Sequence, residues 1–147
     1  MGWIIFFGVS GLAFLVLVPF RQWKRLWSAG IVAMILLYPI DSAFIGLGAF
    51  SYKYGNSILS GLPMFYWLSS FFGGILLVYY YPEKKKWQLP YLILTAGIFL
   101  FMELIMYWVG YFHYNKWSPV RSYFLDFIGF SSILWIVQHI GAMDRKE

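Results

Sequence analysis

Residues 89–112 read LPYLILTAGIFLFMELIMYWVGYF, and Glu103 is the only charged side chain in this run of 24 residues. The hydrocarbon core of a bilayer is about 30 Å thick and is crossed by roughly 20 helical residues. The run is continuously apolar, whereas the strands of a membrane barrel alternate polar with apolar side chains. It therefore predicts a transmembrane α-helix that carries a carboxyl group inside the membrane.

Four further runs have the same apolar character, so we expect an all-α fold, a polytopic bundle of five transmembrane helices. The expected spans are residues 3–20, 26–50, 58–81, 89–112 and 122–142. Since the connections between these spans are short, residues 1–147 are predicted to form a single integral membrane domain without an extramembrane domain.

The composition leads to the same class of protein. Hydrophobic residues make up 61% of the chain and charged residues 12%, whereas about 25% of an average soluble domain is charged. The formal net charge is +5, but the basic residues lie in short connections between apolar runs, where lipid headgroups explain them better than nucleic acid does. The chain has no cysteine, which excludes disulfides and thiolate ligands.

The distribution of basic residues predicts the orientation in the membrane. Six of them lie in the first and third connections and are expected to contact anionic lipid headgroups on the cytoplasmic side: Arg21, Lys24, Arg25, Lys84, Lys85 and Lys86. Two more lie in the carboxyl-terminal tail, which gives eight on one side against three on the other. The positive-inside rule then places the amino terminus outside and the carboxyl terminus in the cytoplasm.

Three carboxyl groups lie inside the predicted spans, on Asp41, Glu103 and Asp126. A charge at bilayer depth costs at least ~2.5 kcal/mol, so each group needs a partner, water or a proton. At 1.5 Å per residue, Asp41 and Glu103 lie about 22 and 21 Å from the inner ends of their spans, and Asp126 about 6 Å below the outer end. All three are therefore expected in the outer half of the membrane, on helices that could bring them together.

The candidate site residues are Asp41, Glu103, Asp126, Tyr107, Tyr111 and Arg121. The two tyrosines, and Tyr114 beyond them, follow Glu103 at offsets of four, eight and eleven and should share its helix face. In one interpretation each acid is a separate interfacial group, with Asp126 paired to Arg121 and Glu103 protonated and bonded to a tyrosine. In the other, these residues form one outward-facing pocket that binds a ligand, a cation or a proton.

Small residues recur at the spacing of close helix contacts. Ala29 and Ala33 are four residues apart, as are Ser69 and Gly73, and Ser70 and Gly74. Such pairs let helix backbones approach closely. The spacing is compatible both with packing inside the chain and with oligomerisation.

Patterns of known catalytic chemistry are missing from the sequence. It contains no HExxH motif, no GxSxG motif and no glycine-rich phosphate loop. His113 and His139 are 26 residues apart, too far to share a metal within one helix. We therefore expect no metal site and no cofactor. An enzymatic activity is the least favoured hypothesis, with Glu103 and Asp41 as acid and base for a lipid or isoprenoid substrate.

Residues 79–135 resemble a family of small, functionally uncharacterised, polytopic membrane proteins of spore-forming Gram-positive bacteria. The residues that carry the resemblance are Tyr80-Tyr81-Pro82-Glu83-Lys84, Glu103 in the next helix, and Tyr114-Asn115-Lys116-Trp117. The resemblance implies a helical bundle in a bacterial cytoplasmic membrane and implies no activity.

Two functions remain as the leading hypotheses. The first is a small membrane protein that binds or transports a ligand, cation or proton through the acidic and aromatic site. The second is a non-catalytic scaffold, assembly factor or immunity-type subunit. Five helices are few for an alternating-access transporter, so a homo-oligomer or a membrane partner subunit would be expected in the first case.

Overall fold

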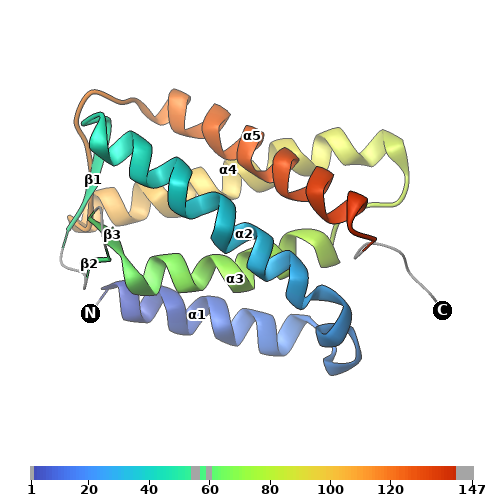
Figure 1. Cartoon of the computed structure of the whole chain (residues 1–147). Helices are drawn as coiled ribbons and strands as arrows, with labels where there is room; N and C mark the ends of the chain where they lie inside the picture. Colours follow the sequence, from blue (N-terminus) through green and yellow to red (C-terminus); the bar gives the residue numbers. More distant parts are fainter. Residues whose placement is uncertain (1, 54–56, 59–60, 142–147) are drawn as a thin grey trace.

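The computed structural model describes residues 2–53, 57–58 and 61–141, and its fold is all-α, as predicted. Five helices lie side by side along a common direction (Figure 1). They are α1 (Gly2–Leu17), α2 (Phe20–Gly46), α3 (Met64–Tyr79), α4 (Lys85–Val109) and α5 (Pro119–His139). Three of them, α2, α4 and α5, are long and apolar enough to cross a membrane. With 16 residues each, α1 and α3 are about 24 Å long.

Several predicted helix boundaries are wrong. Prolines and a glycine determine where the helices actually begin and end. Pro19 in extended conformation starts α2 at Phe20, not at residue 26, so Arg21, Lys24 and Arg25 lie in its first turns and not in a loop. Pro63 likewise delays α3 to Met64 from the expected residue 58. Gly110, at φ 93°, ends α4 at Val109, three residues before the expected end.

The other helix ends shift by a few residues. Helix α5 begins at Pro119, preceded by the cap residue Ser118, and ends at His139, so it replaces the predicted span 122–142. Helix α4 begins at Lys85 and not at residue 89. Both α1 and α3 are shorter at their carboxyl ends than the expected spans.

Two short antiparallel ribbons, which the sequence analysis did not predict, join the helix connections at one end of the bundle. Strand β1 (Phe50–Tyr52) pairs with β4 (Phe112–Tyr114), and Tyr52 lies opposite Phe112. Strand β2 (Ser57–Ile58) pairs with β3 (Leu62–Pro63). Both ribbons lie beside the start of α1 (Figure 1). We call this the strand end, and we call the opposite end, where α2 and α4 begin and α5 finishes, the basic end.

Close packing is concentrated between α2 and α3. A Cβ added to Gly74 of α3 would lie 2.5 Å from the Cβ of Ala33 and 2.7 Å from the carbonyl oxygen of Ala29, both on α2. A Cβ added to Gly73 would meet nothing within 4 Å. Ala29, Ala33 and Gly74 therefore serve packing inside the chain, whereas Gly73 faces outward.

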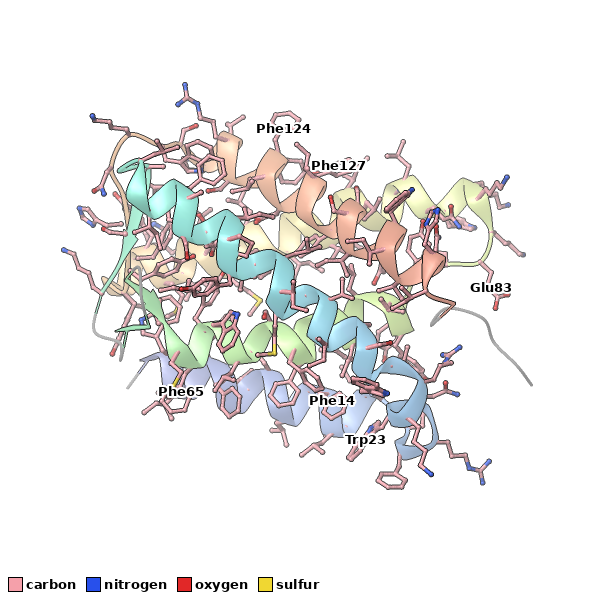
Figure 2. The ribbon with its side chains drawn as sticks, viewed as in Figure 1. Phe14, Trp23, Phe65, Glu83, Phe124 and Phe127 are labelled. Carbon is pink, nitrogen blue, oxygen red and sulfur yellow. The ribbon has the colours of Figure 1, made fainter. Side chains whose placement is uncertain are left out.

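The outer surface of the bundle is apolar. Large side chains on α4 such as Ile98, Leu94 and Phe101 are about half exposed or more, whereas Ala96 of the same helix is buried. Figure 2 shows Phe124 pointing away from the bundle on α5, while Glu83 lies at the basic end. An apolar exposed surface of this extent is the kind that lipid covers.

Candidate functional site

Asp41 of α2 is held at the strand end by a tyrosine from the first ribbon. Its side chain is 5% exposed, and its carboxyl oxygen accepts a hydrogen bond of 2.8 Å from the hydroxyl of Tyr52 on β1. Burial, together with the nearby Asp41 carboxyl group, raises the pKa of Tyr52 well above its usual value. Tyr52 therefore keeps its proton and acts as a hydrogen-bond donor.

Glu103 of α4 has a tyrosine donor from the second strand of the same ribbon. Its Oε1 accepts hydrogen bonds from the hydroxyl of Tyr114 on β4, at 2.7 Å, and from Ser122 Oγ on α5, at 2.8 Å. The indole N–H of Trp117 donates to Ser122 Oγ at 2.9 Å. Burial and the hydrogen bond to Glu103 raise the pKa of Tyr114. The ribbon thus supplies one tyrosine to each of two acids.

Asp126 of α5 is the third acid, and one of its oxygens has no partner. Its Oδ2 is buried and makes no hydrogen bond within the described residues. Asp126 is close enough to interact electrostatically with both Glu103 and Asp41, which also interact with each other. The structure therefore brings together the three acids that the sequence analysis singled out, at the strand end and from three different helices.

Among the residues that the structure describes, no basic side chain is hydrogen-bonded to or paired with these acids. Within the described part of the chain, the three carboxyl groups interact with tyrosine and serine hydroxyls and with one another. Arg121 is exposed, donates a 3.5 Å hydrogen bond to the carbonyl of Lys116 and lies over the ring of Trp117. The expected pairing of Asp126 with Arg121 does not occur among these residues.

Two of the three tyrosines expected beside Glu103 lie elsewhere. Tyr107 is 40% exposed, and its ring packs on that of Tyr114. Tyr111 packs edge-to-face on Trp3 of α1. The donors to the acids are instead Tyr52, which the sequence did not single out, and Tyr114, which was expected on the helix face of Glu103 but lies on strand β4.

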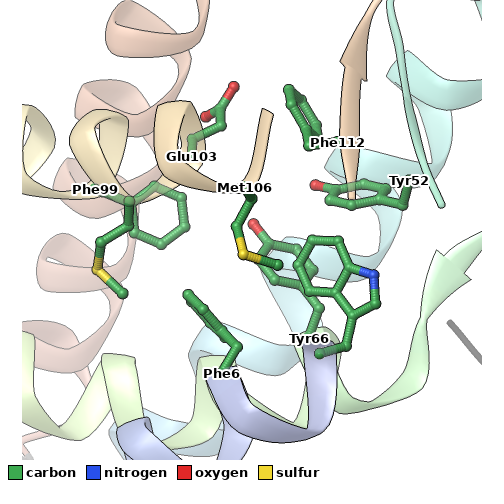
Figure 3. A pocket seen from close by; sticks show the side chains of 9 residues that line it. Phe6, Tyr52, Tyr66, Phe99, Glu103, Met106 and Phe112 are labelled. Atoms are coloured by element: carbon green, nitrogen blue, oxygen red, sulfur yellow. The ribbon is translucent and has the colours of Figure 1, made fainter. Parts of the chain in front are cut away.

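A pocket lies beside Glu103, between α1 and α4 (Figure 3). It is a small cavity of about 20 Å³, enough for about one water molecule. Its lining contains six aromatic rings, two methionines and one acid: Trp3, Phe6, Tyr52, Tyr66, Phe99, Phe112, Met102, Met106 and Glu103. Asp41 and Asp126 do not line it, although the Asp41 partner Tyr52 does.

The acids are not arranged as a metal site. Among the described residues, no three carboxylate or histidine side chains are placed to hold one metal ion. The arrangement instead offers separate carboxyl groups that share a common electrostatic environment. Such groups can hold protons or balance the charge of a cation that needs few oxygen ligands.

Comparison of this chain with protein families, curated proteins and solved structures gives no match. The function must therefore be inferred from the geometry of the strand end itself.

Proposed function

We propose that this chain is an integral membrane protein of a bacterial cytoplasmic membrane that binds a cation at its acidic strand end in exchange for a proton. The observation that carries the proposal is the meeting of Asp41, Glu103 and Asp126 without a basic partner among the described residues. A buried carboxylate without a counter-charge is too costly to persist, so such groups hold protons or a bound cation. Since the described residues place no basic side chain beside these acids, we propose that protons or a bound cation neutralise them.

The proposed topology has five spans, with the amino terminus outside. Helices α2 and α4 both run from the basic end to the strand end (Figure 1), so if both cross the membrane the intervening α3 must cross back. Helix α1 ends shortly before α2 begins, at the same end of the bundle. Both short helices thus connect the same two ends as the long ones, with the local bilayer adjusting to their length.

The basic end supports the cytoplasmic assignment. It carries the six residues predicted to contact anionic lipid headgroups, namely Arg21, Lys24, Arg25, Lys84, Lys85 and Lys86. Lys84 and the two lysines in the first turn of α4, Lys85 and Lys86, are exposed, as is Arg21. We propose that these side chains hold this end at the inner leaflet. The strand end, with the acids, would then face the outside.

Infrared spectroscopy of the protein purified in a neutral detergent tests the proposed function. The C=O stretch of protonated carboxyl groups should be present at neutral pH, and a part of it should vanish in each of Asp41→Asn, Glu103→Gln and Asp126→Asn. Glu83→Gln is the matched control, because Glu83 is exposed at the basic end. A spectrum without protonated carboxyl groups at neutral pH, or one that these three replacements leave unchanged, would overturn the proposal.

A further inference from the structure

Resting on the proposed function, we infer that one water molecule in the cavity beside Glu103 joins its carboxyl group to the hydroxyl of Tyr66, so that Asp41 exchanges its proton through Glu103. Asp41 is the most enclosed of the three acids, with 5% of its side chain exposed, whereas Glu103 is half-buried. A proton that reaches or leaves Asp41 therefore needs a path through its neighbours. The cavity and two tyrosines supply that path.

The cavity meets the two requirements of a buried water. Its volume of about 20 Å³ exceeds the roughly 10–15 Å³ that one water molecule needs, and such a water makes about two to four hydrogen bonds. The lining offers three groups for them, the hydroxyls of Tyr52 and Tyr66 and the carboxyl group of Glu103. Both hydroxyls point to the side on which Glu103 lies (Figure 3). The indole N–H of Trp3, which also lines the cavity, already donates to the carbonyl of Lys53.

Tyr66 of α3 is within reach of all three acids. Its side chain is 8% exposed, and its ring centroid lies 5.4 Å from that of Trp3 and 5.0 Å from that of Tyr52, which fixes the ring. Its hydroxyl group interacts with that of Tyr52 and electrostatically with the three carboxyl groups. Among the described residues no direct hydrogen bond joins it to Glu103. A water molecule in the adjoining cavity completes this connection.

The two ends of the path are hydrogen bonds already present in the structure. At the inner end the Tyr52 hydroxyl donates to the Asp41 carboxyl group at 2.8 Å. At the outer end the Tyr114 hydroxyl donates to Glu103 at 2.7 Å. Tyr114 is half-buried on β4, next to the exposed His113. Glu103 thus has the access to the strand-end surface that Asp41 lacks.

The transfer leaves every intermediate group neutral. The carboxyl proton of Glu103 passes to the water, and another proton of the water passes to the Tyr66 oxygen. The Tyr66 hydroxyl proton then passes to Tyr52, whose own proton passes to the Asp41 carboxylate. Glu103 is left as a carboxylate that takes a proton from outside, and the reverse sequence releases the proton of Asp41. Asp126 on α5 faces both acids but does not line the cavity, so it lies beside the path.

Infrared spectra recorded after transfer of the purified protein into D₂O test the inference, because the C=O band of a carboxyl group shifts when deuterium replaces its proton. The bands of Asp41 and Glu103 are identified by their loss in Asp41→Asn and Glu103→Gln. In Tyr66→Phe, exchange at Asp41 should slow by about tenfold or more, since the path loses a hydrogen-bonded link. Exchange at Glu103 should stay within about twofold of wild type. Glu103→Gln should slow exchange at Asp41 to a similar degree.

Tyr91→Phe is the matched control. Tyr91 of α4 is also a half-buried tyrosine, and its hydroxyl donates to the carbonyl of Leu77 at 2.7 Å, but it does not line the cavity. This variant should leave both exchange rates within about twofold of wild type. A general loss of stability opens the protein more often and speeds exchange. A purely structural role of Tyr66 would therefore change the rate in the opposite direction.

The water molecule itself is detected in a separate measurement. Infrared difference spectra between acidic and neutral pH should contain an O–H stretching band that moves to lower frequency in water labelled with heavy oxygen. This band should be absent from Tyr66→Phe and Glu103→Gln, because each variant removes a partner of the water. Tyr91→Phe should retain it.

Failure of the inference differs from failure of the proposed function. If the protonated carboxyl bands are present but Tyr66→Phe exchanges Asp41 as fast as wild type or faster, the path is wrong and the proton-holding site stands. The same holds if no band responds to heavy oxygen, since the cavity would then be dry. If the protonated carboxyl bands are absent at neutral pH, the proposed function fails and the inference fails with it.

Discussion

The contact between α2 and α3 differs from the region between α1 and α4 in the size of the side chains that separate the two helices. In the first, Gly74 lies against Ala29 and Ala33, with no room for a side chain. In the second, Phe6 and Phe99 face a pocket, with Glu103 among the lining residues. Small residues bring backbones together and favour stability. Large rings fill the region between α1 and α4 and leave only a small cavity beside Glu103.

The largest effect on stability is expected at Gly74, in the close contact between α2 and α3. Gly74→Leu forces a large side chain into the backbone of α2, so we expect the free energy of unfolding to fall by about 3 kcal/mol or more. Gly73→Leu should change it by less than about 0.5 kcal/mol, because the adjacent position is open. Unfolding in mixed micelles with increasing sodium dodecyl sulfate, followed by circular dichroism, measures both. Similar losses in the two variants would mean that α2 and α3 do not meet in this register.

A smaller loss is expected at Ser122, which links the acidic site to the ribbon connection. Ser122→Ala removes a donor to Glu103 and the acceptor of the Trp117 indole N–H. Leaving buried polar groups without partners should lower the free energy of unfolding by about 2 kcal/mol. Ser132→Ala is the control, because Ser132 on the same helix makes only an exposed hydrogen bond, to the carbonyl of Ile128 one turn earlier. An equal, small effect in both would contradict the hydrogen-bond network.

Much of this fold follows from local sequence, and the site follows only in part. Long apolar runs predict helices at α2, α4 and α5, and the cost of buried charge is enough to single out Asp41, Glu103 and Asp126 from the sequence alone. The apolar runs and the three acids can be found in the sequence because length and charge are properties of a single segment. It also finds Gly74 as a packing residue, although not its partner.

The ribbon that brings the tyrosines to the acids could not be found in the same way. Tyr52 and Tyr114 reach the acids because residues 50–52 pair with residues 112–114, a contact between two segments that are distant in the sequence. The sequence signals for this pairing are local and weak. They are Gly110, which ends a helix, and two Phe-x-Tyr triplets, whose aromatic residues favour strands. The Glu103 pocket depends on where α1 lies relative to α4, which no local pattern specifies.

The smallest expected effect has the opposite sign and tests whether the strand end is built for binding at the expense of stability. Asp126→Asn keeps the shape of the side chain and removes a carboxyl group from beside two others. Folding must either bury the Asp126 carboxylate beside two other acids or protonate it, a cost that asparagine does not have, so the variant should be more stable than wild type by about 1 kcal/mol. Glu83→Gln, at the exposed basic end, should change stability by less than about 0.5 kcal/mol. The same detergent titration measures both variants. A clear loss of stability in Asp126→Asn would mean that this carboxyl group has a structural partner. The contrast between the stabilising contact of α2 with α3 and an acidic site that lowers stability would then no longer hold.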